Sequence, residues 1–224
     1  MIAAGQRGSG AAGQERRSRI TALVPEPGGI GSVRIEVDGA RFAAVSPDVV
    51  RRAELRVGRE LDDALRALLD AEAQVEAAYR TVLRCIERRS FARTDLGRRL
   101  LRKGHTPEAV EAALERAAGQ GLIDDAAFAA NYVETRSARG RGPLRLTRDL
   151  MAMGVERGII DRAVASHARE AEGDVNVPLA LAHKRAAQLR DLPRHVRRRR
   201  VLAYLARRGF SGREVSEMVG KLLA

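Results

Sequence analysis

Three glycines, Gly104, Gly154 and Gly209, mark an internal repeat that limits what this chain can fold into more than any other feature. Apolar residues stand eight and four positions before each glycine, and six and ten positions after it. They are Leu96, Leu100, Val110 and Leu114 in the first copy, Leu146, Leu150, Ile160 and Val164 in the second, and Val201, Leu205, Val215 and Val219 in the third. Such spacings predict two amphipathic helices, with a left-handed glycine ending the first of them.

A further helix precedes this pair in each copy, so the repeated unit has three helices. In the first copy its apolar side consists of Val75, Ala78, Tyr79, Val82 and Ile86. Thr94 is expected to cap the second helix, and Leu101 is expected to join its core side. Later helices are expected to begin near Asp124, Pro143 and Glu156, and near Pro178, Pro193 and Ser211. Units of about 50 residues bury small cores, so neighbouring copies should stack into an elongated array.

Before the repeats, the runs ITALV, SVRIEV and ARFAAV favour short strands. Asp38-Gly39 joins the second and third runs and is a strong hairpin signal, whereas GGIG at 28–31 is typical of a turn. Ser46-Pro47 is expected to open a helix. An antiparallel β meander of this size is not stable alone and should pack on the helix that follows.

The fold class is therefore mainly α, with three tandem three-helix repeats preceded by the small β meander. The expected divisions are a disordered tail at 1–19, the meander with helices at 20–70, and repeats at 71–121, 122–173 and 174–224. An acidic stretch at 60–76 contrasts with the basic remainder. It forms a solvated helix face, pairs with a basic face of the same chain, or repels DNA from one side of the protein.

A net charge of +12 and a pI of about 11.1 favour a polyanionic partner. Only three of the 41 basic residues are lysines; bidentate phosphate contacts and the codon bias of a GC-rich genome both explain this. Aromatic residues make up 3% of the chain, too few for a base-stacking platform. The single Cys85, the lack of an apolar run of about 20 residues and the lack of a signal sequence favour a cytoplasmic protein with no membrane partner.

Catalytic patterns are absent from the sequence. There is no GxxxxGK[ST] phosphate loop, and the histidines have no metal-ligand spacing with Cys85. Asp124 and Asp125 suit helix capping better than a catalytic pair, because no base or third carboxylate stands nearby. We therefore expect a protein that is not an enzyme and that uses neither cofactor nor metal.

Basic residues recur instead at matched places on the second helices. Arg98 corresponds to Arg148 relative to the glycine, and Lys103 corresponds to Arg208. The candidate residues for binding a filament or nucleic acid are Arg98, Arg99, Arg102, Lys103, Arg139, Arg141, Arg145, Arg148, Arg197, Arg200, Arg207 and Arg208. A merely solvent-facing role is the alternative. The third helices carry glutamates, which disfavours insertion of that helix into the DNA major groove.

The segments GLIDDAAFAANYVETR and GRGPLRLTRDLMAMGV resemble the central repeat of the RecX family, modulators of the RecA recombinase. VSPDVVRRAELRVGREL resembles the family's N-terminal region, so the likeness covers roughly residues 18–224 and is strongest at 121–155. The resemblance implies a monomer with three three-helix repeats. It would bind the groove of the RecA–DNA filament and restrain ATP hydrolysis and strand exchange in DNA repair and recombination. The alternative is an architectural or transcriptional protein that binds the phosphate backbone of single- or double-stranded DNA without RecA.

Overall fold

The computed structural model describes residues 18–27, 31–170 and 176–224. The tail expected at 1–19 lies outside these residues up to position 17, and so does the turn expected at 28–31 up to position 30. The chain divides into two compact units, one ending at Arg80 and the other beginning at Thr81.

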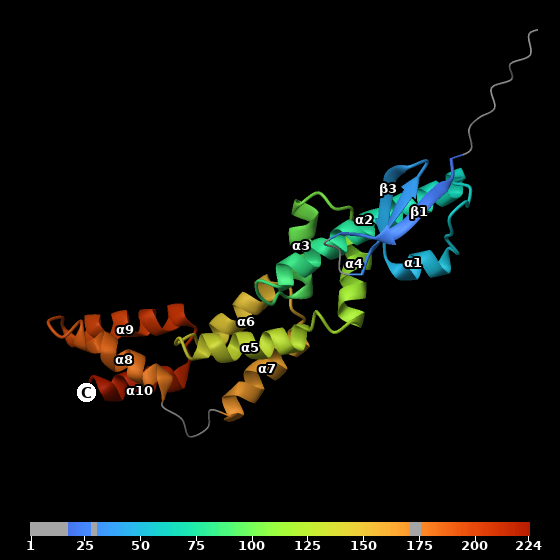
Figure 1. The fold of residues 1–224 in the computed structure, drawn as a ribbon. Helices are drawn as coiled ribbons and strands as arrows, with labels where there is room; N and C mark the ends of the chain where they lie inside the picture. Colours follow the sequence, from blue (N-terminus) through green and yellow to red (C-terminus); the bar gives the residue numbers. More distant parts are fainter. Residues whose placement is uncertain (1–17, 28–30, 171–175) are drawn as a thin grey trace, which may run out of the picture. The chain divides into compact units, whose positions relative to one another are not determined.

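The first unit opens with three antiparallel strands in the order β1 (Ile20–Pro25), β2 (Val33–Val37) and β3 (Ala40–Val45), drawn in blue in Figure 1. Asp38 and Gly39 join β2 to β3 with φ angles of 51° and 81°. Two positive φ angles in a row are the geometry that a two-residue hairpin requires. The predicted meander and its hairpin turn are confirmed.

Two helices follow the sheet. α1 (Pro47–Arg52) begins as predicted, because the Ser46 side chain accepts a hydrogen bond from the Val49 amide at 3.4 Å. α2 (Asp63–Ile86) is a single helix of 24 residues that continues without a break past position 71, where the first repeat was expected to begin.

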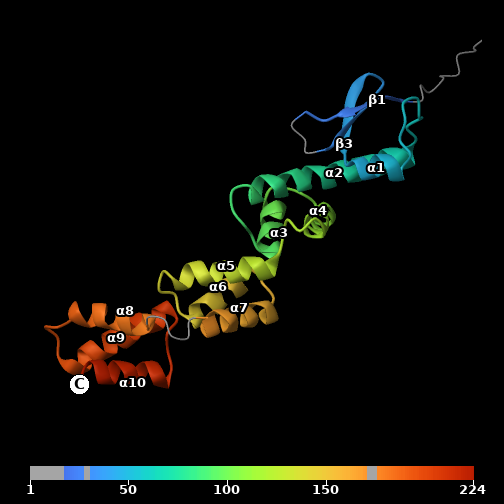
Figure 2. The same cartoon turned by 60° about the horizontal axis from the view of Figure 1, so that its bottom comes forward.

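The core of the first unit lies between the sheet and these helices. Figure 2 shows the sheet beside α2. Ile35 and Val45 of the sheet and Leu69 of α2 are fully buried there. Leu65, one turn before Leu69, belongs to the same cluster. The helix thus supplies the apolar face that three short strands need for stability.

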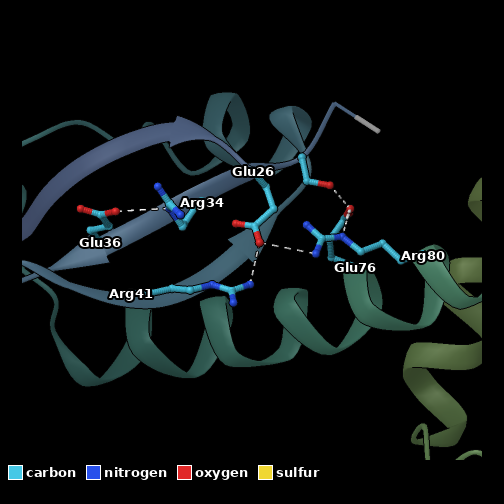
Figure 3. A network of polar contacts seen from close by, with 7 residues as sticks. Glu26, Arg34, Glu36, Arg41, Glu76 and Arg80 are labelled. Carbon is cyan, nitrogen blue, oxygen red and sulfur yellow. Dashed lines mark hydrogen bonds and ion pairs between the residues drawn. The ribbon is translucent and has the colours of Figure 1, made fainter. Parts of the chain in front are cut away.

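Part of the acidic stretch belongs to a polar network beside the sheet, shown in Figure 3. Glu26 Oε1 lies 2.8 Å from Arg41 Nη2 and 3.8 Å from Arg80 Nη1. Arg80 Nε lies 3.6 Å from Glu76 Oε1, which also accepts a hydrogen bond from the Ser32 hydroxyl. The Glu76 side chain is only 3% exposed. For Glu76, the prediction that the acidic stretch pairs within the chain is confirmed, and the prediction of a solvated helix face is wrong.

Replacing Glu76 with alanine should destabilise the protein by about 1–3 kcal/mol, because the Ser32 hydroxyl and the Arg80 guanidinium lose a buried acceptor. Glu72→Ala is the matched control, since Glu72 pairs with Arg52, whose side chain is 67% exposed. A surface ion pair of that kind is worth about 0–1 kcal/mol. Urea unfolding of both variants checks the difference, and equal losses would show that the buried network adds nothing.

Over its described residues, the second unit consists of helices and the turns that connect them, with no strand. The first copy continues from the end of α2 into α3 (Arg93–Arg102) and α4 (Pro107–Gly119). The second copy consists of α5 (Asp125–Ser137), α6 (Pro143–Ala152) and α7 (Arg157–Glu170), and the third of α8 (Val177–Ala187), α9 (Arg194–Arg208) and α10 (Arg213–Leu222). Figure 2 shows the last two copies as separate three-helix bundles. The predicted fold class is confirmed. Across the described ranges, no helix combines the length and apolar character needed to cross a membrane.

The glycines and apolar positions of the repeat behave as predicted. Gly104, Gly154 and Gly209 follow the ends of α3, α6 and α9 with φ angles of 88°, 82° and 93°. Ten of the twelve repeated apolar positions are buried, and Val164 and Val215 are half-buried. The left-handed glycine therefore ends the second helix of every copy and turns the chain into the third.

Two details of the first copy were predicted wrongly. Leu101 is 46% exposed and does not join the core. Thr94 does not cap α3, whose N-cap residue is Ala92. The missing acceptor comes from the next copy, because Asp125 Oδ1 accepts a hydrogen bond from the Arg93 amide at 2.7 Å.

Instead, Thr94 takes part in the contact between the first and second copies, which we call the first joint. Its hydroxyl donates to the carbonyl of Gly154 at 3.1 Å. One turn later, Arg98 Nη1 donates to the carbonyl of Ala152 at 2.9 Å. The start of α3 thus lies against the end of α6.

The second joint repeats this arrangement between the second and third copies. The Gly142 amide donates to the Arg208 carbonyl at 2.7 Å, and the Leu144 amide donates to the Gly209 carbonyl at 3.3 Å. Leu144 stands ten positions before its repeat glycine, as Thr94 does in the first copy. Successive second helices therefore meet end to start at equivalent positions.

Both joints need a glycine for close approach. A Cβ atom on Gly154 would lie 2.5 Å from Thr94 Cβ, and one on Gly209 would lie 2.4 Å from the Arg145 nitrogen. A Cβ atom on Gly104 would meet nothing within 4 Å. Gly154 and Gly209 therefore serve as helix stops and as joint surfaces, whereas Gly104 serves only as a helix stop.

Candidate polyanion-binding site

The second joint borders an open depression of about 490 Å³ whose lining side chains are all arginines. They come from the end of α5, the following turn, the start of α6 and the end of α9: Arg136, Arg139, Arg141, Arg145, Arg207 and Arg208. Five of them are predicted site residues, which the fold brings together from positions up to 69 residues apart. We call this the joint depression.

One carboxylate, Asp149, holds two of these arginines in place. Arg145 Nε lies 2.9 Å from Asp149 Oδ1, and Arg141 pairs with Asp149 Oδ2. The Tyr132 hydroxyl donates to Asp149 Oδ2 at 3.2 Å. Burial raises the pKa of Tyr132, and the Asp149 charge raises it further while Arg141 opposes the rise. A single carboxylate cannot neutralise six guanidinium groups, so the joint depression keeps a strong positive charge.

Arg208 is held by the second joint itself. Its Nη1 atom donates to the carbonyls of Arg139 and Gly140, each at 3.3 Å. Its guanidinium also lies over the Tyr204 ring, 5.0 Å from the centroid. A cation fixed in this way loses little side-chain entropy when an anion binds.

The four predicted residues of α9 share one side of that helix. At about 100° per residue, Arg197, Arg200, Arg207 and Arg208 fall within roughly a third of the circumference. Arg200 and Arg207 are exposed, whereas Arg197 is half-buried.

The predicted residues of α3 separate into three roles. Arg99 and Lys103 line a second depression with the end of α2. Arg98 donates a hydrogen bond to the Ala152 carbonyl at the first joint, so its guanidinium already has a partner within the chain. Arg102 is exposed and forms no ion pair within the described ranges, and the same is true of Arg148 on α6.

The list of candidate residues omitted four arginines that line these depressions: Arg136, Arg84, Arg88 and Arg89. Three of them had a usable signal in the sequence. Arg136 stands four positions after Tyr132 on one helix face, and its guanidinium lies 5.4 Å from that ring. Arg84 and Arg88 are four apart at the end of α2, where the carboxyl end of a helix favours cations.

The paired aspartates are capping residues. Asp124 Oδ1 accepts hydrogen bonds from the amides of Ala126 and Ala127, at 2.8 and 3.0 Å. Asp125 Oδ1 accepts a hydrogen bond from the Arg93 amide at the start of α3. No group of three or more histidine, cysteine or acidic side chains suited to a metal ion occurs among the residues that the structure describes.

Comparisons with known proteins agree with this architecture. Residues 124–164 match the family domain described as RecX, second three-helix domain, and residues 179–219 match RecX, third three-helix domain. The crystal structure of a regulatory protein RecX superposes with a TM-score of 0.76 and 28% identity, over 91% of this chain and 99% of that one.

Two relatives carry the same name. Regulatory protein RecX of Pseudomonas entomophila is 35% identical over 162 residues, covering 71% of this chain and 96% of the relative. Regulatory protein RecX of Halorhodospira halophila is 36% identical over 151 residues, covering 65% of this chain and 88% of the relative. Because two of its three repeats match the family's own domains and the relatives align over nearly their whole length, the chain belongs to the RecX family of regulatory proteins.

Proposed function

We propose that this protein binds the filament that RecA forms on DNA and restrains its ATP hydrolysis and strand exchange, thereby regulating DNA repair and recombination. Membership of the RecX family supports RecA as the target. The observation that carries the proposal is the end-to-start contact of the second helices. Since these helices bear the matched cations, we expect the cations of successive copies to follow one another along the joined helices.

A filament presents the same protomer surface, and the same phosphates, at regular intervals. Three similar copies joined at equivalent positions can each contact one interval, and weak contacts then add through high effective concentration. Arginines suit both phosphates and carboxylates, because their planar fork donates two parallel hydrogen bonds. The protein thus acts on the filament by binding and not by bond chemistry.

The structure selects one exposed arginine on each second helix for a test: Arg102, Arg148 and Arg200. Reversing all three to glutamate should weaken filament binding about 10- to 100-fold, at roughly 0.5–1 kcal/mol for each lost contact. The helix content should not change, because none of the three pairs with another described side chain. Binding to RecA filaments on single-stranded DNA is measured by fluorescence anisotropy.

The matched control reverses three exposed arginines outside the second helices, Arg56, Arg162 and Arg169. It makes the same change in net charge and should weaken filament binding much less. Equal losses in the two triple variants would show that net charge, not the second helices, determines binding.

The same variants also test DNA binding without RecA. Tight binding to duplex DNA that depends on Arg102, Arg148 and Arg200, with no gain when RecA is present, would favour the architectural alternative. In that case the logarithm of the affinity should fall steeply with the logarithm of the salt concentration.

A further inference from the structure

The depression beside α3 differs chemically from the joint depression. It has a volume of about 380 Å³ and lies between the last turns of α2, the turn that follows and α3. Its charged lining consists of five cations, Arg84, Arg88, Arg89, Arg99 and Lys103, together with Thr81, Cys85 and Phe91. No carboxylate lines it. We call it the α2–α3 depression.

Its cations are positioned without being neutralised. Arg84 Nη2 donates to Thr81 Oγ1 at 3.0 Å. The guanidinium groups of Arg89 and Arg99 lie 3.7 and 5.3 Å from the centroid of the Phe91 ring. A ring holds a cation through its quadrupole but carries no net negative charge. Within the described part of the chain, none of the five cations forms an ion pair, whereas Asp149 pairs with two arginines of the joint depression.

The end of α2 offsets this charge only slightly. A helix C-terminus carries roughly half a negative charge, which explains why arginines gather there but cannot balance five cations. The excess positive charge also affects the pKa of a neighbouring histidine, His105. Burial lowers the pKa of His105 below its usual 6.5, and the charges of Lys103 and Arg84 lower it further. His105 Nε2 lies 3.1 Å from Thr81 Oγ1, so one hydroxyl links this histidine to Arg84.

The shape and lining indicate what kind of anion fits. Phe91 is only 6% exposed and Arg89 covers its ring, so no free aromatic face remains for a nucleic-acid base. Several guanidinium forks around one small concave space match the closely spaced oxyanions of linked phosphates. A single carboxylate would leave most of the positive charge unmatched.

We propose that the α2–α3 depression binds a chain of linked phosphates, either a free polyphosphate such as the phosphate tail of a nucleoside triphosphate or a short stretch of nucleic-acid backbone. The site goes beyond the proposed function, because it needs neither RecA nor the other two copies. Phosphate oxygens are held by Arg88, Arg99 and Lys103, while the hydrogen bond to Thr81 holds Arg84 beside them. Occupation adds negative charge beside His105 and so favours its protonated form.

The first test measures binding of sodium tripolyphosphate to the full chain by isothermal titration calorimetry at constant ionic strength. Arg88→Gln and Arg99→Gln should each weaken binding about ten-fold or more, since each removes a charged hydrogen-bond donor. Arg102→Gln is the matched control, because Arg102 is also exposed on the same helix as Arg99 but does not line the depression. It should change the affinity less than about two-fold. Equal losses for Arg99→Gln and Arg102→Gln, or no binding to the parent protein, would overturn the proposal.

The second test follows the histidines by NMR during a pH titration. Tripolyphosphate should raise the pKa of His105. At a fixed pH, it should move the ring signals of the other three histidines much less than those of His105. Equal shifts in all four histidines would mean diffuse screening, and an unchanged His105 would mean an empty depression; either result contradicts the site.

A third comparison identifies the source of the phosphates. If Arg88→Gln and Arg99→Gln weaken oligothymidylate binding as much as tripolyphosphate binding, and the two ligands compete, the natural ligand is nucleic-acid backbone. If oligothymidylate binding is unaffected, it is a free polyphosphate. Both results support the site, and neither depends on filament binding.

Discussion

Gly209→Ala is expected to open the second joint and destabilise the protein by about 2–5 kcal/mol. A left-handed alanine costs about 1–2 kcal/mol, and Gly209 has a φ angle of 93°. The new Cβ atom would also lie 2.4 Å from the backbone nitrogen of Arg145, which cannot move as a side-chain tip can. Crowding of this kind typically costs about 1–3 kcal/mol more.

Amide hydrogen exchange locates the effect. In the parent protein the amides of Gly142 and Leu144 donate across the second joint to Arg208 and Gly209. Both amides should exchange faster in Gly209→Ala, and filament binding should weaken although no charge is removed, because Arg145 and Arg208 no longer face one depression.

Gly104→Ala separates the two causes. Gly104 has a φ angle of 88° but open space where a Cβ atom would be. In this variant the free energy of unfolding should fall only by the cost of a left-handed alanine, about 1–2 kcal/mol. The amides at both joints should keep their protection from hydrogen exchange. Equal destabilisation of Gly104→Ala and Gly209→Ala would show that the joint glycines are needed only as helix stops.

Leu100→Ala should destabilise the protein by about 2–5 kcal/mol, because it leaves a cavity in the core of the first copy. Leu100 is fully buried, as are Leu150 and Leu205 at the equivalent positions. Leu150→Ala and Leu205→Ala should therefore cost similar amounts. Urea unfolding followed by circular dichroism measures all three losses.

Leu101→Ala is the neighbouring control. Leu101 is 46% exposed, so its truncation should change the free energy of unfolding by less than about 1 kcal/mol. A loss as large as that of Leu100→Ala would restore the sequence-based assignment of Leu101 to the core and contradict the described packing.

Most of the fold could be predicted because its signals are local and repeated. Apolar spacing in three copies located the second and third helices, and Asp38-Gly39 located the hairpin, since each pattern depends on neighbours in sequence. The cap of α3 could not be predicted in the same way. Its acceptor, Asp125, stands 32 residues beyond the amide that it serves.

The candidate site was predictable as a set of charges but not as a set of contacts. Matched positions drew attention to Arg98 and Arg148, yet Arg98 donates to the carbonyl of Ala152 and Arg148 remains exposed. Likewise, Asp149 pairs with two candidates through spacings of four and eight residues, and the second of these crosses a turn. Which cations stay available to a partner therefore depends on tertiary contacts that periodicity does not encode.

Steady-state ATP hydrolysis by RecA on single-stranded DNA tests the central claim most directly. Added at substoichiometric to equimolar amounts relative to RecA, this protein should lower the hydrolysis rate progressively, and the Arg102, Arg148 and Arg200 triple reversal should lower it much less. A rate that stays constant over that whole range for the parent protein would contradict the claim that it acts on the RecA filament.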